Sequence, residues 1–258
     1  MTTNKLKTAG LLFAAAMLFS FFAPRVAEAQ TGLEVLWQDD SWPTKHNAIP
    51  HEFAQFSPDG KSVYFPADTS IRKSNGDLED VSRVIQISSE TGEVISVSEL
   101  TKGSQIYDFS MSESGNLYVT AQGQMGMNIW DAHKNVVVDS FLDAPFGFLN
   151  VISVAISPDE KTVVFFHGKK VAEDKVESIL AIYDVDSKKV IKEIPYGDYI
   201  TNMRFSPDGK TLAIGGWGTI KTALEEYDVE RISLWDVVSW KSLGTIASNK
   251  GSSNGVHR

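Results

Sequence analysis

The amino-acid sequence predicts an all-β fold made of repeated four-stranded antiparallel sheets. Three observations support this prediction. A turn motif of the type Ser-Pro-Asp-Gly recurs along the chain, each copy lies between two segments in which apolar and polar residues alternate, and a further alternating segment ends in an aromatic residue followed by aspartate. Alternation with a period of two is typical of a half-buried strand, so each repeat is expected to form one sheet.

The turn motif sets the period of the repeat. Residues 56–65 and 205–214 are nearly identical, and weaker copies occupy 111–119 and 156–165. The serines that open the four copies, at positions 57, 112, 157 and 206, are 55, 45 and 49 residues apart. Periods of roughly 40 to 50 residues are those of propeller blades. We therefore expect a β-propeller of four-stranded antiparallel blades.

The residue types in the motif follow from turn chemistry. Proline presets the first central position of a type I turn, aspartate suits the second, and glycine accepts the left-handed conformation that closes the hairpin. The third copy has Glu160 at the glycine position. A left-handed glutamate is unfavourable by about 1 to 2 kcal/mol, so this turn is expected to be either strained or differently shaped.

Aromatic-Asp pairs mark the third strand of three repeats. They are Trp130-Asp131, Tyr183-Asp184 and Trp235-Asp236, and residues 84–88 are a degenerate version. This pattern resembles the WD-repeat family. The resemblance implies that the aromatic residue packs between blades and that the aspartate starts the next turn. The glycine-histidine pair that often opens a WD repeat is missing from the sequence, so the resemblance is to a divergent member.

Alternation predicts four strands in each blade. They are residues 52–57, 62–67, 82–87 and 93–100 in blade one, 105–111, 116–122, 127–132 and 135–142 in blade two, 150–156, 162–167, 178–185 and 189–194 in blade three, and 199–205, 211–216, 230–237 and 241–247 in blade four.

Residues 33–38 alternate like an outermost strand, yet no inner strands precede them. Propellers commonly let an N-terminal strand complete the last blade, because this hides sheet edges that promote aggregation. The inner strands of that blade would have to follow residue 258. We therefore expect a truncated chain. The alternative is a closed four-bladed ring with a spare edge strand, or closure by oligomerisation.

Residues 1–29 have the pattern of a secretory signal peptide. Lys5 and Lys7 precede an apolar run at 9–22, and Ala27-Glu28-Ala29 fits a cleavage site. The apolar run has 14 residues, fewer than the roughly 20 that a membrane-spanning helix needs. The sequence therefore predicts a propeller domain over residues 30–258, in the periplasm or outside the cell, with no insertion into the membrane after signal cleavage.

Charge and cysteine content narrow the partner classes. The net charge is −9, and removing residues 1–29, with three cations and one carboxylate, makes it −11. A negative chain repels phosphate backbones, so nucleic acid is not an expected partner. The sequence has no cysteine, which excludes disulfides, thiol nucleophiles and thiolate metal sites.

Fragments of catalytic motifs are present but incomplete. His51-Glu52 lacks the second histidine of the zinc-protease motif, because position 55 is Gln55. Gly60-Lys61-Ser62 ends like a phosphate-binding loop without its earlier glycine. The histidines at 46, 51, 133, 167 and 257 show no metal-ligand spacing. We therefore predict no catalytic residue, no metal site and no cofactor.

The connections between the second and third strands differ between blades. Blade two joins them through the short segment 123–126, whereas 68–81, 168–177 and 217–229 are long insertions. In propellers these connections share one face with the loops between blades, and insertions on one face often mark the binding face. Exposed aromatic residues are favoured at interfaces. The predicted partner-binding residues on this loop face are Trp42, His51, Phe146, Phe148, Tyr196 and Trp217.

These features predict an exported protein-binding or scaffold module whose partner is a protein or peptide. An alternative interpretation is a propeller subunit or fragment of an exported enzyme, such as a quinoprotein dehydrogenase or a hydrolase. Clustered carboxylates or histidines at the mouth of the central channel would favour the enzyme. An aromatic, shape-complementary face would favour the binding module, because fold alone does not decide function.

Overall fold

The structure is a computed structural model that describes residues 49–50, 53–72, 74–102, 105–141, 151–172, 175–221 and 226–250. The chain divides into two compact units, residues 1–100 and 101–258. The described residues contain strands and turns but no helix. The predicted all-β fold class is therefore confirmed, and no helix within the described residues is long and apolar enough to cross a membrane.

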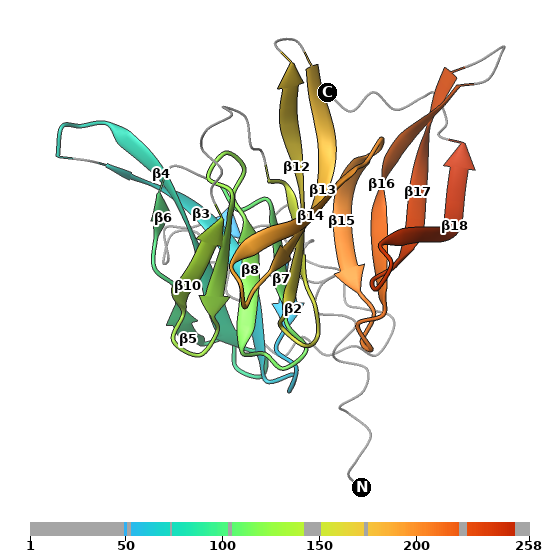
Figure 1. Ribbon diagram of the computed structural model, residues 1–258. Helices are drawn as coiled ribbons and strands as arrows, with labels where there is room; N and C mark the ends of the chain where they lie inside the picture. Colours follow the sequence, from blue (N-terminus) through green and yellow to red (C-terminus); the bar gives the residue numbers. More distant parts are fainter. Residues whose placement is uncertain are drawn as a thin grey trace, which may run out of the picture. The chain divides into compact units, whose positions relative to one another are not determined.

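The first unit contains one antiparallel sheet, which corresponds to predicted blade one (Figure 1). Its long central hairpin consists of β3 (Ser62–Arg72) and β4 (Leu78–Ser88). The short strands β1 (Ile49–Pro50) and β2 (Gln55–Phe56) both pair with β3, and β5 (Val94–Val97) pairs with β4. Of the predicted innermost strand at 52–57, Gln55–Phe56 forms a strand, and the short strand Ile49–Pro50 lies before the predicted segment.

The second unit begins with the short strand β6 (Thr101–Lys102) and contains three four-stranded antiparallel sheets, which are blades two to four. In each, four consecutive strands lie side by side in sequence order. The strands are β7 (Asp108–Met111), β8 (Leu117–Ala121), β9 (Met127–Asp131) and β10 (Val136–Phe141); β11 (Ser153–Ile156), β12 (Thr162–Ala172), β13 (Lys175–Asp184) and β14 (Lys189–Pro195); β15 (Tyr199–Phe205), β16 (Thr211–Lys221), β17 (Glu226–Asp236) and β18 (Lys241–Lys250).

Apolar side chains fill the spaces between successive blades of the second unit. One buried cluster joins blades two and three and includes Met127, Ile129 and Phe165. A second cluster joins blades three and four and includes Phe166 and Leu180. Because alternate residues of a strand point to opposite faces, β12 sends Phe165 to one neighbouring blade and Phe166 to the other. Among the innermost strands, β11 contacts both β7 and β15.

The repeated turn has the predicted chemistry. In blade four, Ser206 Oγ donates to Asp208 Oδ1 at 2.7 Å and accepts from the Thr211 amide at 3.0 Å. The Lys210 amide donates to the same carboxylate, and these hydrogen bonds hold the pKa of Asp208 below its usual value. Gly209 has a φ of 69°, the left-handed conformation expected at that position.

Glu160 forms the same turn as its glycine counterparts. Its φ is 62°, and its amide donates to Ser157 O at 3.0 Å. The turn is therefore strained and not differently shaped. The Glu160 carboxylate accepts hydrogen bonds from the hydroxyl groups of Ser112, at 2.7 Å, and Ser114 in the turn of blade two. These bonds between neighbouring blades offset part of the backbone strain.

The pair Tyr183-Asp184 makes a contact between blades and a turn. The Tyr183 hydroxyl donates to Asp139 of blade two at 2.6 Å, and the ring lies 5.9 Å from Phe141. Asp184 begins the following turn by accepting from the Ser187 amide at 2.7 Å, and Asp131 and Asp236 accept likewise in blades two and four. The aspartate thus sets the last turn of these three blades, and Tyr183 joins blade three to blade two.

The sequence predicts long loops between the second and third strands of blades one, three and four. This prediction is wrong, because these segments continue the two strands. Pairing extends from Ser62↔Ser88 to Arg72↔Leu78 in blade one, to Ala172↔Lys175 in blade three and to Lys221↔Glu226 in blade four. The second and third strands hydrogen-bond to each other along their shared edge, and this pairing does not need the innermost strand. These hairpins therefore continue beyond the innermost strands (Figure 1). The short connection of blade two is confirmed.

Candidate functional site

Two places in the second unit gather polar or aromatic side chains in an arrangement that the core does not require. The first is at the innermost strands, where Asp108 of β7, Ser153 of β11 and Arg204 of β15 meet; we call these residues the Asp108 cluster. The second is at the outer end of blade four, around Trp217.

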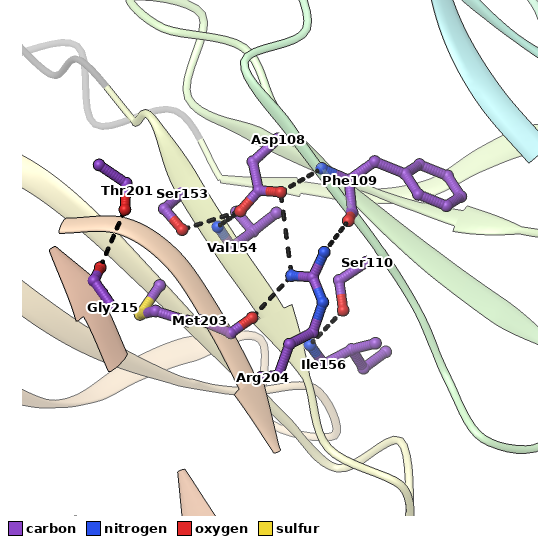
Figure 2. Close-up of polar contacts among 10 residues, drawn as sticks. All are labelled: Asp108, Phe109, Ser110, Ser153, Val154, Ile156, Thr201, Met203, Arg204 and Gly215. Atoms are coloured by element: carbon purple, nitrogen blue, oxygen red, sulfur yellow. Dashed lines mark hydrogen bonds and ion pairs between the residues drawn. The ribbon is translucent and has the colours of Figure 1, made fainter. Parts of the chain in front are cut away.

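Asp108 is fully buried, and its carboxylate is surrounded by donors (Figure 2). Oδ2 accepts from Ser153 Oγ at 2.8 Å and from the Val154 amide at 3.0 Å, and Oδ1 accepts from the Phe109 amide at 2.8 Å. Arg204 Nη1 lies 3.9 Å from Oδ1, and its Nη2 donates to Phe109 O at 3.3 Å. One carboxylate therefore links three blades.

Burial raises the pKa of Asp108 above its usual value, and Arg204 and the three hydrogen bonds oppose that shift. Asp108 and Ser153 have no exposed surface, so a substrate has no access to the carboxylate or to the hydroxyl. A buried charge of this kind needs all of its partners to be tolerated. The Asp108 cluster is thus suited to holding blades together and not to catalysis.

The outer end of blade four is built on the connection between β14 and β15. Tyr196, a predicted contact residue in this connection, is half-buried: its ring lies 5.9 Å from Trp235, and its hydroxyl lies 3.0 Å from Ser233 Oγ. Burial raises the pKa of Tyr196. Arg231 Nη1 donates to Asp198 Oδ2 at 2.9 Å. The connection is therefore fixed to blade four on both sides of Gly197.

Two glycines of β16 let this connection approach closely. A Cβ atom on Gly216 would lie 2.0 Å from the carbonyl oxygen of Tyr199, and one on Gly218 would lie 2.3 Å from Asp198 Oδ1. Any larger residue would displace the backbone or the ion pair. Trp217 lies between the two glycines, and its side chain is 50% exposed. The surrounding contacts thus fix the backbone that presents this exposed indole.

The structure brings together only part of the predicted contact set. Tyr196 and Trp217 lie on blade four, but Trp217 belongs to β16 and not to a loop as predicted. The predicted residues Trp42, His51, Phe146 and Phe148 lie outside the described residues, as does the expected strand at 33–38.

Sequence reasoning missed Tyr199, which is 56% exposed and is the register partner of Trp217. The sequence predicts it only as the first residue of the strand at 199–205. The sequence Gly215-Gly216-Trp217-Gly218 carried a usable signal, because glycine in a strand marks a close approach of backbone. Within the described residues no group of three or more His, Cys, Asp or Glu side chains is arranged to hold a metal ion.

No protein-family model matches the chain, and no curated protein matches it. Solved structures do match, 1056 chains of them. One is Kuenenia stuttgartiensis hydrazine synthase, a propeller-type protein, with a TM-score of 0.52 and 17% sequence identity. The match covers 78% of this chain and 50% of that one, so the chain spans about half the length of this neighbour. The likeness shows the fold alone.

Proposed function

We propose that the chain is an interaction module that binds a protein or peptide partner at the end of the blades where the long hairpins emerge. The observation that carries this proposal is the pair of half-exposed aromatic residues Tyr199 and Trp217 on a backbone fixed by Gly216, Gly218 and the Asp198–Arg231 ion pair. Aromatic side chains dominate binding energy at interfaces. A rigid support reduces the entropy lost on binding.

The proposal includes export and a distant relationship to WD repeats. The signal pattern of residues 1–29 supports a periplasmic or extracellular location, and the turn motif with its aromatic-Asp strand ends supports the relationship. Mass spectrometry of the chain recovered from the producing cells tests export: we expect an N-terminus near Gln30. Recovery of intact residues 1–29 in the cytoplasm would contradict it.

A capture experiment tests the binding function. The full chain, immobilised, is incubated with an extract of the producing cells, and the recovered partner is then titrated against purified variants. We expect the double variant Tyr199→Ala, Trp217→Ala to weaken affinity about tenfold or more, as loss of interface anchors does. Ile191→Ala removes an equally exposed apolar side chain from β14 and is the matched control. Equal affinity of the double variant and the control would overturn the proposed site.

A second variant tests the wider loop face predicted from the sequence. It changes Phe146, Phe148 and Trp217 together to alanine, which we expect to abolish capture. If capture is lost with Trp217 changed alone and the two phenylalanines add nothing, the binding face is confined to blade four.

A second candidate function is a non-catalytic propeller subunit of an exported enzyme. The similarity to a chain of hydrazine synthase favours it, because that protein supplies an example of this architecture within an enzyme. Native mass spectrometry of the tagged chain purified from its own cells distinguishes the two functions. A stoichiometric complex with a catalytic subunit, whose activity falls when this chain is removed, would support the second candidate.

A further inference from the structure

Tyr199, Trp217 and Glu230 form a cross-strand row at the outer end of blade four; we call it the Trp217 row. Tyr199 of β15 and Glu230 of β17 are the register partners of Trp217 on its two sides. Register partners in an antiparallel sheet have their side chains on the same face, with Cβ atoms about 4.5 to 5.5 Å apart. All three residues are exposed. The Tyr199 ring packs edge-on against Phe166 of blade three, with ring centroids 6.1 Å apart, so Trp217 and Glu230 are the indole and the carboxylate that the row offers to a ligand.

One flank of the indole is open. The next row on the same face is Asn202, Gly215 and Ile232. Gly215 has no side chain, and a Cβ atom there would meet only the Asn202 carbonyl oxygen, at 3.9 Å. Ile232 beside it is 41% exposed. A ligand can therefore lie against the face of Trp217 without displacing any side chain of β16.

The Trp217 row lies at the edge of the part of a blade that a neighbouring blade covers. By alignment of the turn motifs, Trp217 corresponds to Gly168 of blade three. The buried core that blade three shares with blade four ends at Phe166 and Leu180. Gly168 and its register partner Ser178 are half-buried, so the corresponding positions of blade four retain accessible surface that a ligand can contact.

The row and the whole chain carry negative charge. Glu230 is the carboxylate of the row, and it is exposed. Arg231 is paired with Asp198, and the whole chain has a net charge of −9. Complementarity therefore favours a cationic partner, since opposite charge steers association and like charge opposes it.

We propose that the Trp217 row binds a lysine or arginine side chain of a basic polypeptide segment. The cation lies over the indole of Trp217, a cation–π contact for which tryptophan is the best ring. The Glu230 carboxylate is its counter-ion. This inference rests on the proposed binding function and specifies the chemistry of the partner.

Synthetic peptides test the inference on the full chain. The probes are capped nonapeptides with three Gly-Arg-Ser, Gly-Lys-Ser or Gly-Glu-Ser repeats. Binding is followed through the indole N–H resonances of the six tryptophans, with that of Trp217 assigned from Trp217→Phe. We expect the two basic peptides, and not the glutamate peptide, to shift the Trp217 resonance saturably. Affinity should fall several-fold between about 20 and 150 mM salt, as screening shortens the reach of charge.

Variants separate the two parts of the proposed contact. Trp217→Ala should abolish binding of the arginine peptide, and Trp217→Phe should retain part of it, because a smaller ring is a weaker cation–π partner. Glu230→Gln should weaken binding about three- to tenfold. Glu113→Gln, which neutralises an exposed carboxylate in the turn of blade two, is the matched control and should leave affinity unchanged.

The outcomes distinguish this inference from the proposed function. Equal binding of the acidic and basic peptides, or no shift of the Trp217 resonance with any of them, would overturn the inference. If capture of the natural partner still depended on Tyr199 and Trp217, the proposed function would stand with a partner of different chemistry. If capture did not depend on them, both would be wrong.

Discussion

Blade two and blade four are built from the same repeat but end their central hairpins differently. In blade two the hairpin stops near the end of the innermost strand, and Trp130 is 1% exposed. In blade four the hairpin continues to Lys221 and Glu226, and Trp217 is 50% exposed. Trp130 pairs with Tyr118 inside the four-stranded part of its sheet, whereas Trp217 pairs with Tyr199, the first residue of the innermost strand β15, at the end of that part. The same repeat thus supplies a stable core and, at its end, a surface available for binding.

The largest expected effect compares the two tryptophans directly. Trp130 stacks on Tyr118, with ring centroids 5.5 Å apart, and its Nε1 donates to Thr120 at 2.9 Å. Trp130→Ala should lower the free energy of unfolding by about 3 to 5 kcal/mol. Trp217→Ala should change it by no more than about 0.5 kcal/mol. Urea denaturation measures both, and similar losses would show that the two rows are not energetically distinct.

The Asp108 cluster should give the next largest effect. Asp108→Asn replaces one acceptor oxygen by an amide donor that faces the Ser153 hydroxyl or the Val154 amide. We expect a loss of about 2 to 4 kcal/mol in the free energy of unfolding, since a buried donor is left unsatisfied. Asp186→Asn, at an exposed position in a turn of blade three, is the control. A loss no larger than in the control would mean that the cluster does not hold the blades together.

A smaller effect on stability is expected at Glu160, which links the turn of blade three to the turn of blade two. Glu160→Ala removes the hydrogen bonds to Ser112 and Ser114 and keeps the left-handed strain, whereas Glu160→Gly removes both. We therefore expect the glycine variant to be more stable than the alanine variant by about 1 kcal/mol. Thermal denaturation of the two variants measures the difference. Equal stability of the alanine and glycine variants would indicate that the backbone at residue 160 is not strained in solution.

The smallest expected effect comes from giving blade three a short hairpin like that of blade two. Gly168 and Ser178 are register partners, so an Asn-Gly turn can replace residues 169–177. We expect the free energy of unfolding to change by about 0.5 kcal/mol or less, because the segment removed lies beyond the innermost strand. Circular dichroism and urea denaturation report the outcome. A large loss would show that the extension supports its blade.

The repeated part of the fold could be predicted from the sequence because its signals are local. A Ser-Pro-Asp-Gly turn determines its own hydrogen bonds, and alternation within a strand determines which residues face a neighbouring blade. The long hairpins were missed because the sequence of the blade three extension, with Gly168, Lys169 and Lys170 in succession, has no alternation of apolar and polar residues. Hydrophobic alternation identifies a strand only where one face is buried.

The candidate site was only partly predictable for a different reason. Trp217 was identified because an exposed aromatic residue is unusual, whereas Tyr199 and Arg231 looked like ordinary strand residues. Their importance depends on register, which places them beside residues far away in the sequence. The Asp108 cluster was missed for the same reason: its members come from three blades, and no local pattern connects them.

The Asp108 cluster also bears on how the second unit folds. Ser153 and Arg204 reach Asp108 and the Phe109 carbonyl across 45 and 95 positions of sequence. Closing such long loops is slow, because chain entropy is lost before the contact forms. Until β11 and β15 arrive, water is the better environment for the Asp108 carboxylate, so β7 gains little by docking early. Blades two, three and four are therefore expected to consolidate together in one late kinetic step, and not one after another along the chain.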